Sequence, residues 1–62
     1  MFISINNYLL KVDGIEAAYP CDCLGNKEDD NERFTYIIHR GGFKGVYDIN
    51  YRELVELIKK TR

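Results

Sequence analysis

Apolar and polar residues alternate most clearly over residues 34–47, which read FTYIIHRGGFKGVY. This alternation is typical of two β-strands, because successive side chains of a strand point to opposite faces of the sheet. Gly41 and Gly42 separate the two runs, and paired glycines suit a two-residue turn whose central positions both need positive φ. We therefore predict a hairpin in which Arg40 faces Phe43.

The turn sets the pairing of the two strands and divides their side chains between two faces. It places Ile37 opposite Val46 and Tyr36 opposite Tyr47. We predict that the face with the larger apolar side chains packs into the core: Phe34, Tyr36, Ile38, Phe43 and Tyr47. We predict that the mixed face stays outside the core: Thr35, Ile37, His39, Lys44 and Val46. A slip of one residue would exchange the two faces.

Three further extended segments are predicted before this hairpin. Residues 2–5 and 8–10 flank the pair Asn6-Asn7, a turn signal because asparagine tolerates the left-handed conformation. Residues 15–19 alternate and are followed by Pro20, which lacks an amide hydrogen and ends a strand or lies at an edge. A short helix is the alternative for residues 15–19, but the flanking turn residues favour the strand.

Residues 51–61 have the clearest helical pattern. Asn50 is placed to cap the first turn, and Glu53 stands three residues further on, as a capping box requires. The apolar residues share one stripe of this helix: Tyr51, Leu54, Val55 and Ile58. The whole pattern predicts an α+β fold, an antiparallel β-meander of four or five short strands with one C-terminal α-helix packed on one face.

Length and charge narrow the function classes. We expect the 62 residues to form a single domain, and a chain of this length buries only about 60% of its unfolded surface. The net charge of −1 provides no overall attraction to nucleic acid or to an anionic membrane. We expect no membrane association and a cytoplasmic location, because no apolar run could span a bilayer and the first residues do not resemble a signal peptide.

The two cysteines offer little chemistry. Cys21 and Cys23 are too close for an easy disulfide, which agrees with a reducing compartment. With His39 they are the only soft metal ligands, whereas a structural zinc site needs four, so we expect no metal and no cofactor. A site shared between subunits is the alternative. We expect no enzymatic activity, because no oxyanion loop and no third group accompany a cysteine–histidine pair.

The polar stretch of residues 23–33 is predicted to be a solvated connection between two antiparallel strands. A mobile acidic loop that meets a basic partner is the alternative. A calcium loop is not expected, because the acids lack the regular spacing and the closing glutamate of such loops.

Among the function classes considered, a binding role is the one that the sequence favours. A sheet covered by one helix leaves its other face exposed, and five tyrosines are suggestive because tyrosine is enriched at interfaces. The leading hypothesis is a small non-enzymatic binding module that forms a homo-oligomer and acts as a regulator or inhibitor by binding a protein or sequestering a small molecule. The residues expected at the contact are Ile37, His39, Arg40, Phe43, Lys44 and Val46. The alternative is a nucleic-acid-binding protein that uses the basic hairpin tip and the basic helix end.

The layout also resembles a known family. A short strand, Asn6-Asn7, Ile15-Glu16 and Pro20 precede a strand–glycine–strand–helix ending, which is similar to the small FlbD/SwrD-type proteins linked to flagellar motility. The acidic loop from Leu24 to Arg33 has no counterpart in that pattern, and neither do Cys21 and Cys23. The resemblance implies a β-meander followed by a helix and does not carry over the motility role. Phages and mobile elements encode proteins of similar layout that bind a host protein or sequester a small molecule, which is an analogy of fold only.

Overall fold

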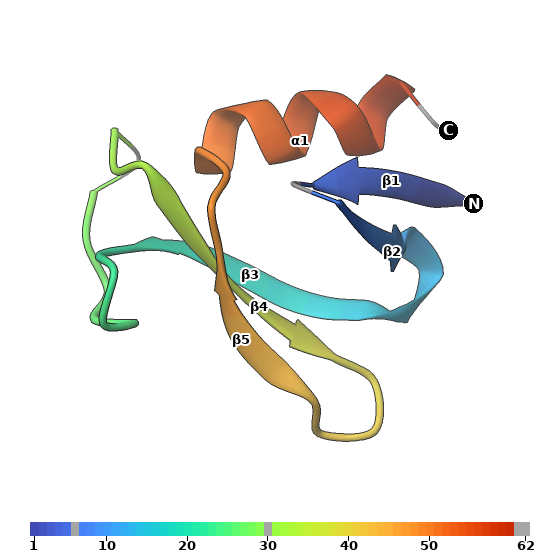
Figure 1. The fold of residues 1–62 in the computed structure, drawn as a ribbon, viewed down its shortest axis with the longest axis horizontal. Helices are drawn as coiled ribbons and strands as arrows, with labels where there is room; N and C mark the ends of the chain where they lie inside the picture. Colours follow the sequence, from blue (N-terminus) through green and yellow to red (C-terminus); the bar gives the residue numbers. More distant parts are fainter. Residues whose placement is uncertain (6, 30, 61–62) are drawn as a thin grey trace.

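The computed structural model describes residues 1–5, 7–29 and 31–60 of the chain. These contain, in order (Figure 1), β1 (Phe2–Ile5), β2 (Tyr8–Lys11), the 3-10 turn η1 (Val12–Gly14), β3 (Ile15–Cys21), β4 (Phe34–His39), β5 (Lys44–Tyr47) and α1 (Tyr51–Lys60). The α+β fold with antiparallel strands and a C-terminal helix confirms the prediction from the sequence. Residues 15–19 belong to a strand, as their flanking turn residues indicated.

The strands form two antiparallel sheets instead of one continuous sheet. β1 pairs with β2, with Ile3 opposite Leu10. Asn7, in the connection between them, has a φ of 72°, as expected of a turn asparagine, whereas Asn6 lies outside the described residues. The second sheet has the order β3-β4-β5, so β4 is its central strand. The turn η1 joins the two sheets.

The core lies between the β1–β2 hairpin, the helix and one face of the β3–β5 sheet (Figure 1). Its buried apolar side chains come from these elements, from η1 and from the segment before the helix: Ile3, Ile5, Leu10, Val12, Ile37, Ile49 and Leu54. Ile37 lies on the central strand and is fully buried, and Leu54 is the buried residue of α1. The hairpin and the helix therefore cover the same side of the sheet.

Asn50 anchors the start of α1. Its side-chain Oδ1 accepts a hydrogen bond from the N–H of Arg52 at 2.9 Å, which satisfies one of the amides that a helix start leaves without a partner. Its Nδ2 donates to the carbonyl of Glu32 at 2.8 Å. The predicted cap at Asn50 is confirmed, and it also ties the helix to the segment before β4.

The loop of the β4–β5 hairpin is longer than predicted. The N–H of His39 donates to the carbonyl of Phe43 at 2.6 Å, so these two residues close the hairpin. Residues 40–42 form the loop between them, in place of two glycines alone. Gly41 and Gly42 have φ of 92° and 91°, a region that glycine adopts without strain. The glycine pair does mark the turn, but a third residue belongs to it.

The longer loop shifts the strand pairing by one residue. Ile37 lies opposite Gly45 instead of Val46, and Val46 lies opposite Tyr36. The two faces of β4 are therefore exchanged relative to the prediction, as a one-residue slip requires. The residues of β4 that were expected in the core lie on the other side of the sheet: Phe34, Tyr36 and Ile38.

Three further side-chain assignments are corrected by the structure. Ile37 was expected on the uncovered face, but it lies at the centre of the core. Thr35 was also expected outside, but it is fully buried and its hydroxyl donates to the carbonyl of Ile49 at 2.7 Å. Phe43 was expected in the core, but it is 76% exposed beside the loop. Val46 lies outside the core and is 37% exposed, as predicted.

A matched pair of substitutions tests the register. Ile37→Ala removes a fully buried side chain and leaves a cavity, so we expect it to lower the free energy of unfolding by about 2–5 kcal/mol. Ile38→Ala, on the other face, should cost about 1 kcal/mol. Urea unfolding followed by circular dichroism measures both. Equal losses, or a larger loss for Ile38→Ala, would show that the register is wrong.

Candidate interaction surface

The side of the β3–β5 sheet turned away from α1 is called the outer face here. Its side chains come from all three strands and are largely apolar: Ala17, Tyr19, Tyr36, Ile38 and Val46. All five are exposed or half-buried. The rings of Tyr19 and Tyr36 stack on each other, with centroids 5.1 Å apart and planes 6° from parallel. The sheet thus presents a largely aromatic and aliphatic surface that α1 does not cover, with the exposed Lys44 on the same face near the hairpin tip.

Residues 22–27 form a hydrogen-bonded loop at one end of this face. Oδ1 of Asp22 accepts hydrogen bonds from the N–H groups of Leu24 and Asn26, both at 2.9 Å. The backbone bond from Asn26 is the main cause that lowers the pKa of the Asp22 carboxyl, against an opposing effect of burial. This part of the polar stretch is therefore held by its own side chains and is more than a solvated connection.

Gly25 brings this loop against the outer face. It has a φ of 90°, and a Cβ at this position would lie 3.3 Å from the ring of Tyr36. The hydroxyl of Tyr19 donates to the carbonyl of Gly25 at 3.5 Å. Cys21 is fully buried where the loop leaves β3, and burial, followed by the nearby Asp22 carboxylate, raises the pKa of its thiol. The loop closes one end of the outer face and leaves the end near the hairpin tip open.

The edge of the sheet along β5 carries backbone groups that β4 does not use. Bonded and non-bonded residue pairs alternate along an antiparallel ladder. Because His39 and Phe43 form a bonded pair, the N–H and C=O groups of Lys44 and Val46 point away from β4. No strand in the described part of the chain pairs along this side of β5. We call it the β5 edge.

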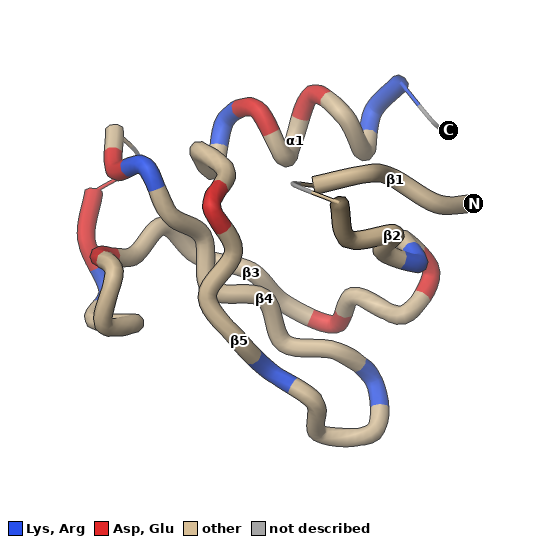
Figure 2. Tube along the Cα trace, viewed as in Figure 1, with Lys and Arg blue, Asp and Glu red and all other residues tan. Residues whose placement is uncertain are grey.

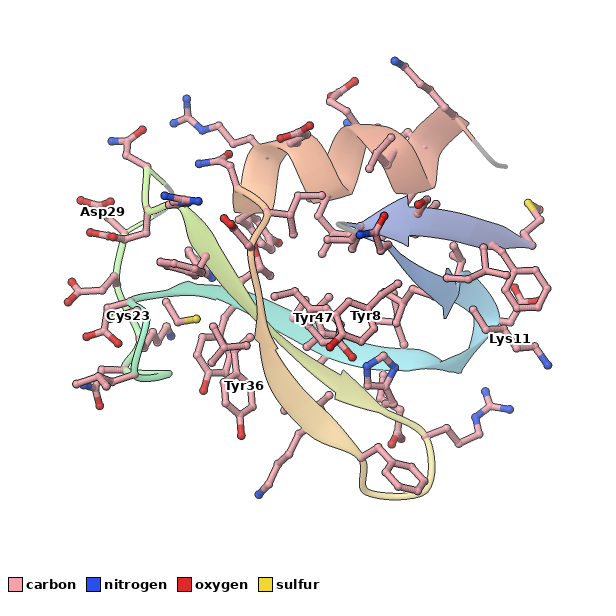
Figure 3. The ribbon with its side chains drawn as sticks, viewed as in Figure 1. Tyr8, Lys11, Cys23, Asp29, Tyr36 and Tyr47 are labelled. Atoms are coloured by element: carbon pink, nitrogen blue, oxygen red, sulfur yellow. The ribbon has the colours of Figure 1, made fainter. Side chains whose placement is uncertain are left out.

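A groove of about 350 Å³ opens at the β5 edge. It lies between β5 and the tip of the β1–β2 hairpin, and its lining is mostly apolar: Ile5, Tyr8, Phe34, Gly45, Val46, Tyr47 and Asp48. Figure 3 shows Tyr8 and Tyr47 next to each other, with ring centroids 6.0 Å apart and planes at 81°. The Tyr47 hydroxyl is 3.1 Å from Nε2 of His39. The groove has the volume of a small ligand site or of a few side chains.

An ion pair borders the groove. Arg33 donates from Nε and Nη2 to the two carboxylate oxygens of Asp48, at 2.6 and 2.7 Å. This bidentate bond lowers the pKa of the Asp48 carboxyl and raises that of the Arg33 guanidinium. The guanidinium also lies 5.5 Å from the centre of the Phe34 ring. Asp48 is therefore held as a carboxylate just after β5.

The predicted contact residues are divided between four places. Arg40, Phe43 and Lys44 are exposed together at the hairpin tip. Val46 lies on the outer face, and His39 is half-buried beside Tyr47. Ile37, in the core, does not belong to the surface.

The two basic groups proposed for nucleic-acid binding lie apart. Figure 2 shows the basic residues of the hairpin tip at one end of the molecule and those of the last helical turn, Lys59 and Lys60, at the other. They therefore do not form one continuous basic surface.

The sulfur and imidazole groups do not meet within one chain. Cys21 pairs with Phe34 at one end of the β3–β4 ladder, and His39 pairs with Ile15 at the other. Cys23 is exposed in the loop. Among the residues that the structure describes, no three His, Cys, Asp or Glu side chains are grouped to hold a metal ion. A catalytic or metal site built by these three residues of a single chain therefore has no geometric support.

The groove was not foreseen in the sequence. Its lining joins Ile5 and Tyr8, from the first hairpin, with Phe34 and the end of β5. Periodicity predicted these strands but carries no information on how the first hairpin packs against the second. The only available signal was Tyr8, an aromatic residue beside a turn, which the structure leaves exposed.

Comparison with known proteins yields no relative: no family model, no curated protein and no solved structure matches the chain. The resemblance to FlbD/SwrD-type proteins therefore remains a hypothesis about layout. No helix in the described residues has the length and hydropathy needed to cross a membrane. Support for a function therefore comes from the surface geometry.

The ion pair at Asp48 predicts a pH dependence of stability. The pKa of Asp48 is lower in the folded chain than in the unfolded chain, so its stabilising effect is present above about pH 4 and is lost as the pH falls through the folded value. Arg33→Gln should therefore lower the thermal midpoint at pH 7, and the difference from the wild type should close at pH values below the folded pKa. Lys11→Gln, which removes an exposed positive charge elsewhere, is the control. A difference that stays constant over this range would contradict the pairing.

Proposed function

We propose that this chain is a small non-enzymatic binding module that associates with a second copy of itself and acts as a regulator or inhibitor by binding a protein or sequestering a small molecule. The observation that supports it is the one-sided cover of the β3–β5 sheet. The helix and the first hairpin pack on one face, whereas the outer face keeps apolar side chains from three strands in contact with solvent.

The energetic argument concerns the character of the outer face. An antiparallel sheet can face water on one side when that side is polar. Here Ile38, Tyr36 and Val46 lie on the uncovered side, and Val46 is 37% exposed. Exposed apolar patches on small proteins mark interaction sites, because their transfer from water is favourable. A domain of 62 residues has a small core, so additional burial by association has a large relative effect.

Nucleic-acid binding is the second candidate. Arg40, Lys44 and Phe43 combine positive charge and an aromatic ring at the hairpin tip, which is the chemistry of single-strand recognition. Two observations weigh against it. The rings of Tyr19 and Tyr36 stack on each other, so one face of each ring is already covered and cannot stack on a base. The basic helix end also lies away from the hairpin tip (Figure 2).

The proposal predicts the effect of a charge on the outer face. Val46→Asp places a carboxylate in the proposed apolar contact, which costs free energy in the assembly and little in the monomer, where Val46 is already 37% exposed. We expect the dissociation constant of the assembly to rise at least about tenfold, with unchanged helicity. Light scattering and circular dichroism measure the two quantities. Leu9→Asp, on β2 and 72% exposed, is the matched control. If the wild type and Val46→Asp have the same particle mass, the proposal fails.

A salt titration separates the two candidates. Phosphate contacts release counterions, so nucleic-acid binding would weaken steeply between about 50 and 200 mM salt. We expect self-association to change little over this range and a single-stranded RNA oligonucleotide to show no binding by fluorescence anisotropy. Salt-sensitive RNA binding that Lys44→Gln weakens would favour the second candidate instead.

A further inference from the structure

The β5 edge has the properties of a strand-pairing site. The N–H and C=O groups of Lys44 and Val46 point outward, and the described residues provide no strand to meet them. Gly45, between them, has no side chain to keep a neighbouring backbone away. Unpaired strand edges are templates for a further strand, and the backbone bonds supply affinity while side-chain sites supply specificity.

We propose, resting on the self-association argued above, that β5 pairs antiparallel with β5 of a second copy about a twofold axis at Val46. The two three-stranded sheets then become one six-stranded sheet. In this register the outward backbone groups of Val46 bond to those of the partner's Val46. Gly45 of each chain lies opposite the partner's Tyr47.

The charges select this register from its neighbours. With the axis at Val46, Lys44 lies opposite the partner's Asp48, and the twofold axis repeats this opposite-charge pair. With the axis at Gly45, Lys44 would lie opposite the partner's Val46, and with the axis at Tyr47 it would lie opposite the partner's Asn50. Opposite charges placed directly across an antiparallel pair stabilise it, and like charges destabilise it. A foreign peptide would have to reproduce this alternation, whereas a second copy contains it.

The groove at the β5 edge is an independent reason to propose a second copy of the chain as the partner. Along each strand, Phe43, Gly45 and Tyr47 share the core side of the sheet, because side chains alternate between faces. In this register Phe43 lies opposite position 49 of the second copy. The Phe43 ring then lies next to the groove of that copy, on the side where Tyr8 and Tyr47 form the wall. Phe43 is 76% exposed in the single chain, so the pairing covers an aromatic ring that otherwise faces water.

Charge reversal tests the register directly. Lys44→Asp places a carboxylate opposite the partner's Asp48 on each side of the axis. Asp48→Lys places an ammonium group opposite the partner's Lys44 in the same way. We expect each variant alone to have a dissociation constant at least about tenfold above that of the wild type. An equimolar mixture of the two variants should restore a dimer, because no like charges face each other when one chain of each variant pairs. In the mixed dimer, one crossing pairs the introduced carboxylate with the introduced ammonium group, and the other keeps the native pair. Analytical ultracentrifugation measures all three samples, and thermal melts confirm that Asp48→Lys, which loses Arg33 as partner, remains folded.

The backbone bonds and the groove are tested by two further variants. Val46→Pro removes an N–H that points outward, so the β4–β5 ladder should persist while the dimer weakens. Phe43→Ala should raise the dissociation constant at least about tenfold without affecting the melt of the monomer.

The outcomes also separate this inference from the proposed function. If the wild type associates and Val46→Asp weakens the assembly, but the two charge variants associate like the wild type, the β5 pairing is wrong and contact through the outer face stands. If the wild type is monomeric at all measurable concentrations, both proposals fail. Restoration of the dimer in the mixture alone, and not in either separate variant, supports the Val46 register.

Discussion

The hydrogen bond from the N–H of His39 to the carbonyl of Phe43 is the contact on which the rest of the structure depends. It closes the β4–β5 hairpin over a three-residue loop and thereby decides which residues of the two strands lie opposite each other. That pairing sends Ile37 to the core and Tyr36 to the outer face. It also decides which backbone groups of β5 are left for another chain. One local closure therefore defines the core, the exposed face and the free edge together.

Most of the buried apolar side chains lie on one face of the β3–β5 sheet. The first hairpin contributes Ile3, Ile5 and Leu10, and the helix contributes Leu54 with partly buried neighbours. No second helix is described that could pack on the opposite side. The loop of residues 22–27 covers only one end of it, with Gly25 against Tyr36. A larger protein would cover the outer face with a further layer of secondary structure. In this chain the outer face is exposed unless another molecule covers it.

The elements of the fold could be predicted from the sequence because each has a local cause. The helix follows from its apolar stripe and the cap at Asn50, and the strand before Pro20 follows from alternation between turn signals. The pairing of β4 with β5 could not be settled this way. Two glycines accept both a two-residue and a three-residue loop, and Ile37 and Ile38 are equally apolar, so only packing against the first hairpin separates the registers.

The candidate site was predictable only where it is local. Lys44 and Val46 were expected at the surface from the hairpin alone, and the structure leaves both exposed. The groove depends on how the first hairpin meets β5, which no local pattern encodes, so Ile5 and Tyr8 were missed. The contribution of Asp48 also escaped notice, because it arises from a partner, Arg33, fifteen positions earlier in the chain.

A net charge near zero conceals an uneven distribution along the sheet. Acidic side chains, among them Asp22 and Asp29, gather around the loop at one end, and Arg40 and Lys44 occupy the hairpin tip at the other (Figure 2). The two ends of the sheet therefore differ in the sign of most of their charges, although the chain as a whole is nearly neutral. Two such bodies attract when they lie side by side in opposite directions, at separations up to about 10 Å in 0.1 M salt. If two copies associate as proposed, this charge distribution would favour the antiparallel orientation before their surfaces touch, and dilute buffer would strengthen the effect.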